Sequence, residues 1–397
     1  MLVNTDLHIH SKYSMAVSAD MDLPTIAREA ARKGVKIVGT GDCLFTAWLD
    51  NIKELPENEG FFVLGDTLFA LTVEVEDSRR VHHLILLPDA SKAEELREGF
   101  TPKSINLEND GRPRVRMNGA EIADLVLEAG GLIGPSHAFT PWTGIFAYYQ
   151  SLSECYQEKA KEIRFIELGL SADTDYADRI ADLSSRTFLS NSDAHSPRSN
   201  KLAREFNQMV MDSLCYQDLV MAIKREKGRH PMLNAGFFPE EGKYNRTACT
   251  RCFRQYSQDQ MNEFVGRCPS CGGLIKLGVK DRVERLADHS HPVHPDHRPP
   301  YRHIIPLAEI IALSLGHKSP TTAGVQRHWK EMTEDRTEIQ VLLEVDLEEI
   351  KAKVQEQIQQ AEKKIAILDK VLPVLKTFDG KTCTKRIETK VKEALPE

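Results

Sequence analysis

Short apolar runs alternate with amphipathic stretches over roughly the first 235 residues. Each apolar run is typical of a buried strand ending in polar residues, and the runs occupy residues 2–10, 35–42, 69–76, 81–88, 131–137, 163–171 and 186–195. Between several of them, the spacing of apolar positions predicts helices over 23–33, 119–129, 173–184 and 216–227. Asp22, Pro24 and Gly34 mark the ends of the first helix. Strand–helix alternation predicts an α/β fold with a parallel sheet, and seven units predict that the sheet closes into a barrel.

Two further regions follow this barrel region of residues 1–235. Residues 243–280 are organised around cysteines, and residues 281–397 open with a basic Pro/His-rich stretch at 289–303. A helical pattern follows at 304–316, and the last sixty residues, rich in Glu, Lys, Gln, Ile and Leu, are expected to be helical or partly mobile. We therefore predict a barrel, a small cysteine module and a helical C-terminal region.

Composition and charge narrow the class of protein. The 397 residues are 41% hydrophobic, enough for a substantial core, and no run of eighteen apolar residues or secretory signal occurs. We expect a cytoplasmic protein that makes no membrane contact. The net charge is −7, yet residues 243–330 carry +7 and the rest −14. An acidic body with a basic module suits a metal-dependent enzyme acting on a polyanion, although two solvated surfaces of opposite sign would look the same.

Histidines and carboxylates recur at the carboxyl ends of the predicted strands, where barrels keep their active sites. His8 and His10 alternate along the first strand, so both imidazoles point to one face. One such pair is often a core pair, but it is joined at other strand ends by Asp42, Glu74, His82 or His83, His137, Asp193 and His195. This many nitrogen and oxygen ligands would be enough for two or three divalent ions such as Zn²⁺, Mg²⁺ or Mn²⁺.

Two C-x-x-C pairs, fifteen residues apart, predict a tetrahedral structural zinc in the cysteine module. The ligands would be Cys249, Cys252, Cys268 and Cys271. A redox role is the alternative, and disulfides are not expected inside the cell. Four arginines decorate this predicted zinc ribbon and are expected to contact a nucleic-acid backbone: Arg246, Arg251, Arg254 and Arg267. A brace between domains is the alternative role for the ribbon.

The barrel motifs resemble the PHP (polymerase and histidinol phosphatase) superfamily. DLHIHS, a GTGD strand end, the Glu of VEVE, HLILLP, the His of PSHAF and SDAHS occur in the superfamily's order over roughly residues 1–235. The resemblance implies a distorted seven-stranded β/α barrel whose multi-metal centre hydrolyses phosphoesters. The implied ligands are His8, His10, Asp42, Glu74, His83, His137, Asp193 and His195, and the implied catalytic residues among them are Asp193, His8 and His195.

Two of these assignments rest on a choice between neighbours. The superfamily's T-D-H motif stands here as Gly41-Asp42-Cys43, and we favour Asp42 as the ligand because a thiolate would select soft metals. Strand alternation sends His82 and His83 to opposite faces, and we favour His83 because HLILL matches the superfamily pattern.

The segments beyond the barrel narrow the resemblance. GKYNRTACTRC, CPSCGG and HPDHRPPYRHIIPLAEII resemble the endonuclease Q family, and the match spans roughly residues 1–330. It implies a DNA-repair endonuclease that incises 5′ of deaminated bases (hypoxanthine, uracil, xanthine) or abasic sites. Its partners would be damaged DNA and, as further candidates, replication or repair proteins. The alternative is a PHP-type small-molecule phosphatase, such as a histidinol-phosphatase-like enzyme, which would explain the metals but give the ribbon no use.

Metal ions at the base of the barrel mouth cannot reach the phosphate next to a base that is still stacked and paired in the duplex. We therefore predict that the target nucleotide is flipped out of the helix. Ser171 and Asn191 are candidate donors to the new carbonyl of a deaminated base, and Trp142 or Phe139 is a candidate stacking surface. Loop capping and ordinary packing are the alternatives for each of them.

Overall fold

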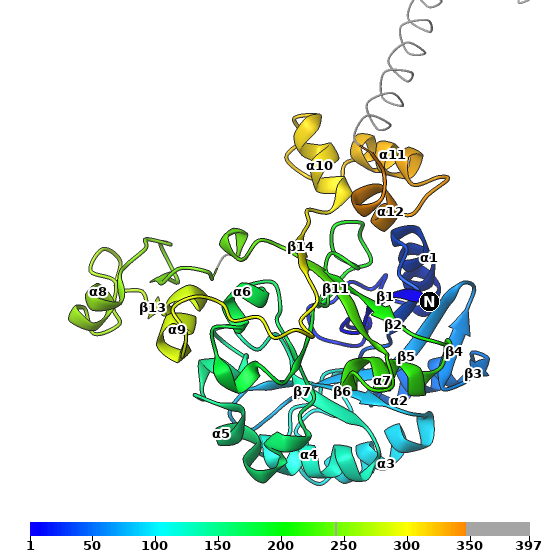
Figure 1. The fold of residues 1–397 in the computed structure, drawn as a ribbon, viewed down its shortest axis with the longest axis horizontal. Helices are drawn as coiled ribbons and strands as arrows, with labels where there is room; N and C mark the ends of the chain where they lie inside the picture. The colour runs from blue at the N-terminus through cyan, green and yellow to red at the C-terminus, as the bar shows by residue number, and fades with distance from the viewer. Residues whose placement is uncertain (243, 347–397) are drawn as a thin grey trace, which may run out of the picture. The chain divides into compact units, whose positions relative to one another are not determined.

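The computed structural model describes residues 1–242 and 244–346 (Figure 1). Residues Met1–Ile339 form one compact unit, and Gln340–Glu397 are grouped separately. The barrel, the cysteine module and residues 281–339 thus lie in one unit. The prediction for the last sixty residues falls mostly on 347–397, outside the described residues.

Seven strands build the barrel in the order in which they occur along the chain. They are β1 (Leu2–Asp6), β2 (Ile37–Gly39), β5 (Thr67–Glu76), β6 (His82–Leu87), β7 (Leu132–Pro135), β8 (Phe165–Glu167) and β9 (Thr187–Leu189). Just beyond the strand ends, hydrogen bonds join the segment after β7 to β8 (Ala138 N to Glu167 O, 2.8 Å) and the segment after β9 to the segment after β1 (His10 N to Ala194 O, 3.0 Å). The predicted seven-stranded barrel is confirmed.

The barrel departs from an all-parallel sheet at β6. This strand pairs antiparallel with both β5 and β7, whereas β1, β2 and β5 run parallel, as do β8 and β9. Only residues 77–81 separate β5 from β6, too few for the crossover that a parallel pair requires. This hairpin is the distortion of the barrel.

Helices cover the outside of the barrel, and three of the predicted ones are confirmed: α1 (Leu23–Lys33), α4 (Gly119–Glu128) and α7 (Tyr216–Lys224). The Asp22 carboxylate accepts from Thr25 N at 2.9 Å, and Gly34 ends α1 in the left-handed region at φ 89°. The helix expected over 173–184 is instead α6 (Thr174–Ala177) and a 3₁₀ turn at Ala181–Leu183. The remaining helices of this region are α2 (Thr46–Lys53), α3 (Ala90–Phe100), α5 (Leu152–Tyr156) and short 3₁₀ turns at Ile145–Ala147, Gln157–Glu162 and Pro239–Glu241.

Additional strands widen the sheet at both sides of the barrel. On the β1 side lie β10 (Phe206–Val210), β11 (His230–Gly236) and β14 (Tyr301–His303), and on the β5 side lie β4 (Phe61–Leu64) and β3 (Glu57–Asn58). The buried core joins barrel residues such as Leu7, Leu84 and Phe165 to Met209 and Leu219 outside it. Strand β10 thereby fixes β1, which leads directly into His8 and His10.

The zinc-ribbon region contains the two-residue strands β12 (Ala248–Cys249) and β13 (Ile275–Lys276) and helix α8 (Gln258–Glu263). Helix α9 (Val279–Leu286) follows and packs beside α6 (Figure 1). The Pro/His-rich stretch then returns to the barrel, where the buried Arg298 bonds Asp178 at 2.8 Å.

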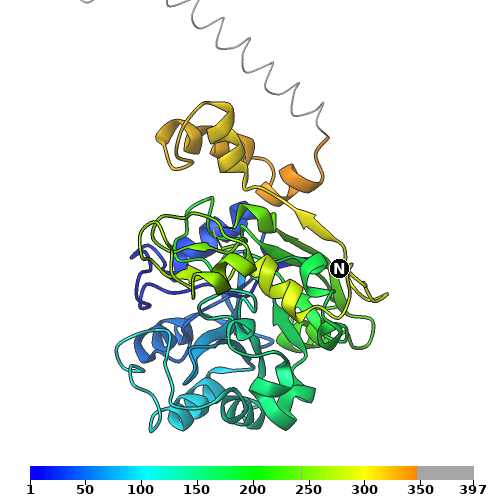
Figure 2. The same ribbon diagram turned by 90° about the vertical axis from the view of Figure 1, so that its left-hand side faces the viewer.

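Beyond that stretch, β14 leads from the barrel to α10 (Leu307–Ser314) and α11 (Ala323–Met332), drawn in yellow and orange in Figure 2. A short helix, α12 (Glu338–Leu343), ends the described part. Lys33 of α1 bonds Glu338 at 2.7 Å with both side chains buried, which ties this segment to the barrel. Among the described residues, no helix combines the length and apolar character needed to span a membrane.

Candidate active site

Polar side chains from five strand ends meet at one end of the barrel. Their backbones are unusual, because Asp42 (φ 52°), His137 (φ 27°) and Asp193 (φ 46°) adopt the left-handed region. Such a conformation costs a non-glycine residue on the order of 1–2 kcal/mol. Here it turns the chain sharply at each strand end. Gly41 is also left-handed, and a side chain there would strike the carbonyl of Ile9, between His8 and His10. Strain of this kind concentrates at functional sites.

The Glu74 carboxylate lies at the centre of the cluster. Its Oε1 is 2.8 Å from His137 Nε2, 2.8 Å from His82 Nδ1 and 3.5 Å from His8 Nε2. Its Oε2 is 3.6 Å from His10 Nε2. Four imidazoles therefore surround one buried carboxylate.

The Asp193 carboxylate is a second acidic group that faces some of the same histidines. Its Oδ1 is 3.3 Å from His10 Nε2, 3.7 Å from His195 Nε2 and 3.8 Å from His8 Nε2. Together the two carboxylates and the histidines around them give three groups of candidate ligand atoms, each within 4.8 Å: His8–His10–Glu74, His10–Asp193–His195 and Glu74–His82–His137. Glu74 and His10 each belong to two groups, which is the arrangement expected of a multi-metal centre.

The residues present fit divalent cations. The Nε2 atoms of His8, His10 and His195 are buried and have no hydrogen-bond partner within the described part of the chain. They face carboxylate oxygens at distances that an intervening ion would bridge. The opposite Nδ1 atoms of His8 and His10 bond Glu167 (2.8 Å) and Asp42 (3.2 Å). Carboxylates behind histidines in this way orient metal ligands.

The electrostatics keep the carboxylates ionised. Burial opposes ionisation of Glu74, but His82 and His137 hold its pKa well below the ordinary value. His10 and His8 likewise lower the pKa of the half-buried Asp193. Burial would also lower the pKa of His8, but Glu167 outweighs it and raises that pKa to about 10. In His195 burial dominates and lowers the pKa to about 4, which leaves a neutral imidazole with a free lone pair. Because ligands must lose their protons to bind a cation, metal binding here is coupled to pH.

Asp42, expected to be a ligand, lies behind the cluster. Its Oδ2 accepts from Ser11 N at 2.6 Å and from Ser11 Oγ at 2.7 Å, while Oδ1 faces His10 Nδ1. No described ligand group contains it. The geometry therefore makes Asp42 a positioning residue for His10.

Sequence reasoning missed two charged residues. Glu167 of β8 bonds His8 and also accepts from His137 N at 3.0 Å, and its signal was an acidic residue inside the apolar run IRFIELGL. Arg112, from the loop between α3 and α4, places Nη1 3.3 Å from Glu74 Oε2. Nothing in its local sequence marks Arg112, because only the folded loop brings it to the barrel mouth.

The structure places His82, and not the favoured His83, beside Glu74, and the role of His83 as a ligand stays a prediction. His82 is the histidine beside Glu74, whereas His83 points to the other face of β6. There His83 Nδ1 bonds the Tyr156 hydroxyl at 2.7 Å, and its Nε2 lies 3.4 Å from Asp77. The alternation of β6 was predicted, but the motif match selected the residue on the outer face.

This pair of neighbours provides a test of the site. We expect His82→Ala to lower phosphodiester cleavage by about 10²-fold or more, as loss of one electrostatic group at a reacting centre commonly does. His83→Ala should instead lower the unfolding midpoint, because it removes a buried hydrogen bond, while the chemical rate in the folded protein persists. Single-turnover cleavage and thermal unfolding separate the two, and a reversed pattern would restore His83 to the site.

A cleft of 830 Å³ opens beside the cluster. His137 and Asp193 form part of its wall, together with Thr140, Ser171, Lys201, Arg204, Tyr244 and Glu309. Ser171 thus lies where a flipped base could reach it. Tyr244 and residues from α10 also line the cleft.

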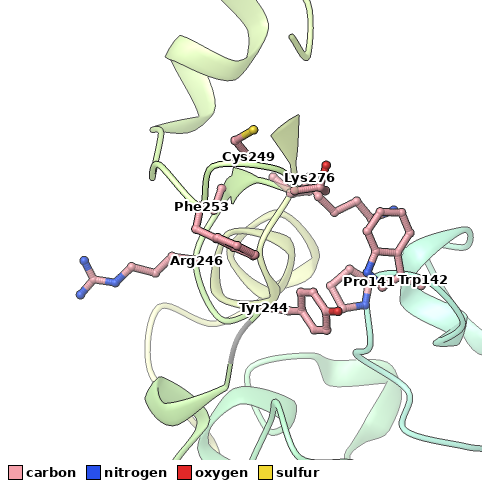
Figure 3. Close-up of a pocket in the computed structure, with 10 residues that line it drawn as sticks. Pro141, Trp142, Tyr244, Arg246, Cys249, Phe253 and Lys276 are labelled. Carbon is pink, nitrogen blue, oxygen red and sulfur yellow. The ribbon is translucent and has the colours of Figure 1, made fainter. Parts of the chain in front are cut away.

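The three other candidates for the base pocket lie elsewhere. Asn191 is fully buried, and its Oδ1 accepts from Leu7 N (2.9 Å) and Asn207 Nδ2 (3.1 Å), so it braces β1 and does not face the cleft. Phe139 is buried against Phe146. Trp142 lines a different pocket, between the barrel and the zinc ribbon (Figure 3).

The four cysteines of the ribbon come together as predicted. Cys249 and Cys271 sulfurs are 3.5 Å apart, Cys252 and Cys268 sulfurs are 3.6 Å apart, and all four lie within 4.8 Å of one another. Thiolates so arranged fit a tetrahedral Zn²⁺. The four ribbon arginines are exposed.

Buried histidines and carboxylates beside an open cleft at the end of a β/α barrel define a metal-dependent hydrolase. Comparisons with known proteins specify the kind of hydrolase.

Residues 306–364 match the MJ0043 C-terminal domain family. The uncharacterized protein MJ0043 of Methanocaldococcus jannaschii is 42% identical over 220 residues, covering 54% of this chain and only 27% of that protein. The uncharacterized protein YqxK of Bacillus subtilis is 28% identical over 328 residues, 77% of this chain and 82% of that protein.

Two solved structures resemble the whole described unit. The lesion-specific endonuclease PfuEndoQ from Pyrococcus furiosus is 45% identical, with a TM-score of 0.83 over 89% of this chain and 88% of that chain. An endonuclease Q bound to a 27-mer duplex with an abasic lesion at the active site is 44% identical, with a TM-score of 0.85 over 89% of each chain. The chain belongs to the endonuclease Q family. The resemblance noted in the sequence is confirmed, and with it the class of metal-dependent, lesion-specific DNA-repair endonuclease.

Proposed function

We propose that this chain hydrolyses the phosphodiester on the 5′ side of a deaminated base (hypoxanthine, uracil or xanthine) or an abasic site in duplex DNA. The target nucleotide is flipped into the cleft beside the histidine–carboxylate cluster. The observation that carries this proposal is the shared wall: His137 and Asp193 belong both to the cluster and to the cleft. A nucleotide in the cleft therefore has its phosphate at the cluster.

Seven residues would hold the divalent ions: His8, His10, Glu74, His82, His137, Asp193 and His195. Bound ions of this kind polarise a phosphoryl oxygen and lower the pKa of a water molecule. The chain's own carboxylates at Glu167 and Asp42 keep the Nδ1 protons of His8 and His10 in place, so that each Nε2 presents its lone pair to the cluster. The ions would be two or three of Zn²⁺, Mg²⁺ or Mn²⁺, which suit nitrogen and oxygen ligands.

Positive charge in and near the cleft suits a polyanion. Lys201 and Arg204 line the cleft next to Asp193, and Arg112 lies at Glu74. Arg204 Nε donates to Ser192 O at 2.9 Å, which fixes its guanidinium beside the Asp193 turn. These cations would orient the flanking phosphates.

Selection of the damaged base would occur in two steps. Unpairing costs least for a mismatched or deaminated base, and an abasic site has no base to unstack. The cleft then favours a base that forms hydrogen bonds with its polar groups, which include Ser171 and Thr140. A buried polar group left without a hydrogen bond costs about 1–3 kcal/mol. The zinc ribbon would add non-specific contacts to the DNA backbone through Arg246, Arg251, Arg254 and Arg267. Replication or repair proteins as further partners stay a prediction.

End-labelled duplexes that each carry one hypoxanthine, uracil, xanthine or abasic site test the proposal. We expect one cut 5′ of each lesion, none in the matched undamaged duplex, and DNA affinity that falls steeply with salt concentration. Hydrolysis of phosphomonoesters without lesion cleavage would point to a small-molecule phosphatase instead.

A further inference from the structure

A second pocket, distinct from the metal cleft, lies between the barrel and the zinc ribbon. Its volume is 160 Å³, and its wall combines the rings of Trp142, Tyr244 and Phe253 with the cations of Arg246 and Lys276. Figure 3 shows Phe253 on the ribbon side, Pro141 and Trp142 on the barrel side, and Tyr244 beside Pro141. Lys276 Nζ stands 4.4 Å from the centre of the Trp142 ring. The ten lining residues include no carboxylate.

Phe253 is an unexpected residue at its position. It follows the C-x-x-C pair Cys249–Cys252, and its N bonds Cys249 O at 3.0 Å with φ 57°. Gly272 holds the equivalent place after Cys268–Cys271, with its N 2.8 Å from Cys268 O and φ 68°. This left-handed backbone favours glycine and penalises a side chain. The first knuckle nevertheless carries a phenylalanine that is 59% exposed. The left-handed backbone therefore does not account for a phenylalanine at this position.

The pocket adjoins the metal cleft. Tyr244 lines both spaces, and the loop that begins at His137 places Thr140 in the cleft and Pro141 and Trp142 in the pocket. A DNA strand held at the cluster would therefore pass the pocket within a short distance of the cleaved bond.

We propose that this pocket binds one unpaired nucleobase of the substrate DNA, outside the metal cleft, by stacking on Phe253 and Trp142 while Arg246 and Lys276 attract its phosphates. The proposal rests on the function proposed above. Aromatic faces with interleaved cations and no carboxylate are the general chemistry of single-stranded nucleic-acid binding. The base comes either from the cleaved strand next to the flipped nucleotide or from the opposite strand.

The variant Phe253→Gly tests the pocket without harming the fold, because it removes the ring and relieves the left-handed backbone. Val265→Gly is the matched control: Val265 is also left-handed (φ 49°), lies in the same ribbon and is 85% exposed, but does not line the pocket. The full zinc-loaded chain would be titrated with lesion duplexes that carry 2-aminopurine at one position at a time, in either strand.

We expect one position to change fluorescence on binding to the wild type and to Val265→Gly, but not to Phe253→Gly. Phe253→Gly should raise the DNA concentration for half-maximal cleavage at least about fivefold, with the saturated single-turnover rate unchanged. Trp142→Leu should abolish the same signal from the barrel side. The strand that carries the signal identifies the source of the base.

The inference is wrong if no position responds in a Phe253-dependent way, or if both glycine variants shift half-saturation equally. Failure of the proposed function would look different, since the wild type would then cleave none of the lesions whatever the fluorescence reports.

Discussion

Replacing Asp193 by asparagine is expected to reduce cleavage of a lesion-containing duplex by about 10²–10³-fold or more. The Asp193 carboxylate faces His8, His10 and His195 within 3.8 Å and also forms part of the cleft wall. An amide keeps the shape but loses the charge that a cation needs. His8→Ala should have an effect of similar size because His8 faces both Glu74 and Asp193.

The measurement is single-turnover cleavage, with the metal content of each protein and far-UV circular dichroism taken alongside. Asp42→Asn is the control. The Asp42 carboxylate contacts the His10 nitrogen that faces away from the cluster. Asp42→Asn should therefore lower the cleavage rate by only about 10–100-fold, as for carboxylates that orient metal-bound histidines. Full activity in Asp193→Asn or His8→Ala would remove the cluster from the reaction. Equal losses in Asp193→Asn and Asp42→Asn would return Asp42 to the ligand set.

The periodicity of the chain was sufficient to predict the barrel. Each apolar run was long enough to form one buried strand of the barrel. The polar residue after it therefore lies at one end of the barrel. The antiparallel course of β6 was also encoded, in the five residues between β5 and β6, but the rule of strand–helix alternation overlooked it. Local spacing therefore fixed the elements, whereas connection length fixed the direction of β6.

Side-chain roles proved harder to predict than positions. Asp42 stands at a strand end like the other site residues, yet the turn at Gly41 aims it at the far nitrogen of His10. Asn191 shares its strand end with Asp193 but points inward, where it bonds the backbone of β1. Strand position gives the face of the sheet on which a residue lies. Whether it touches an ion, a base or another ligand depends on the rotation of one or two backbone angles, which the sequence pattern does not contain.

Residues contributed by other parts of the chain could not be predicted at all. Arg112 reaches Glu74 from a loop, and Tyr244 closes the cleft from the segment before the ribbon. The pocket around Phe253 likewise combines residues more than a hundred positions apart. The Arg112 contact is set by the fold of the loop between α3 and α4, and the other two are set by how the segment around the ribbon packs on the barrel. Local periodicity reports neither.

Replacing both Cys249 and Cys252 by serine is expected to unfold the zinc ribbon and to weaken DNA binding, while the barrel stays folded. The ribbon has two-residue strands and a core of only Cys249, Cys268 and Ile275, with partly buried neighbours around them. So small a core cannot hold the chain by itself, whereas a four-cysteine zinc site contributes on the order of 10–16 kcal/mol at neutral pH. Without the ion, the exposed arginines would lose their fixed positions and Phe253 its place beside Trp142.

Zinc content, fluorescence anisotropy over a salt series and hydrolysis of a chromogenic phosphodiester together test this expectation. The double variant should lose one equivalent of zinc and most of its DNA affinity, but keep the hydrolysis of the small phosphodiester, because all seven proposed ligands of the cluster lie in the barrel. Cys215→Ser is the matched control: the Cys215 sulfur caps α7 by accepting from Asp218 N at 3.3 Å, which a serine hydroxyl also does. Equal loss of DNA affinity and of small-substrate hydrolysis in the double variant would instead show that the ribbon braces the barrel, since the cluster could then not stand without it.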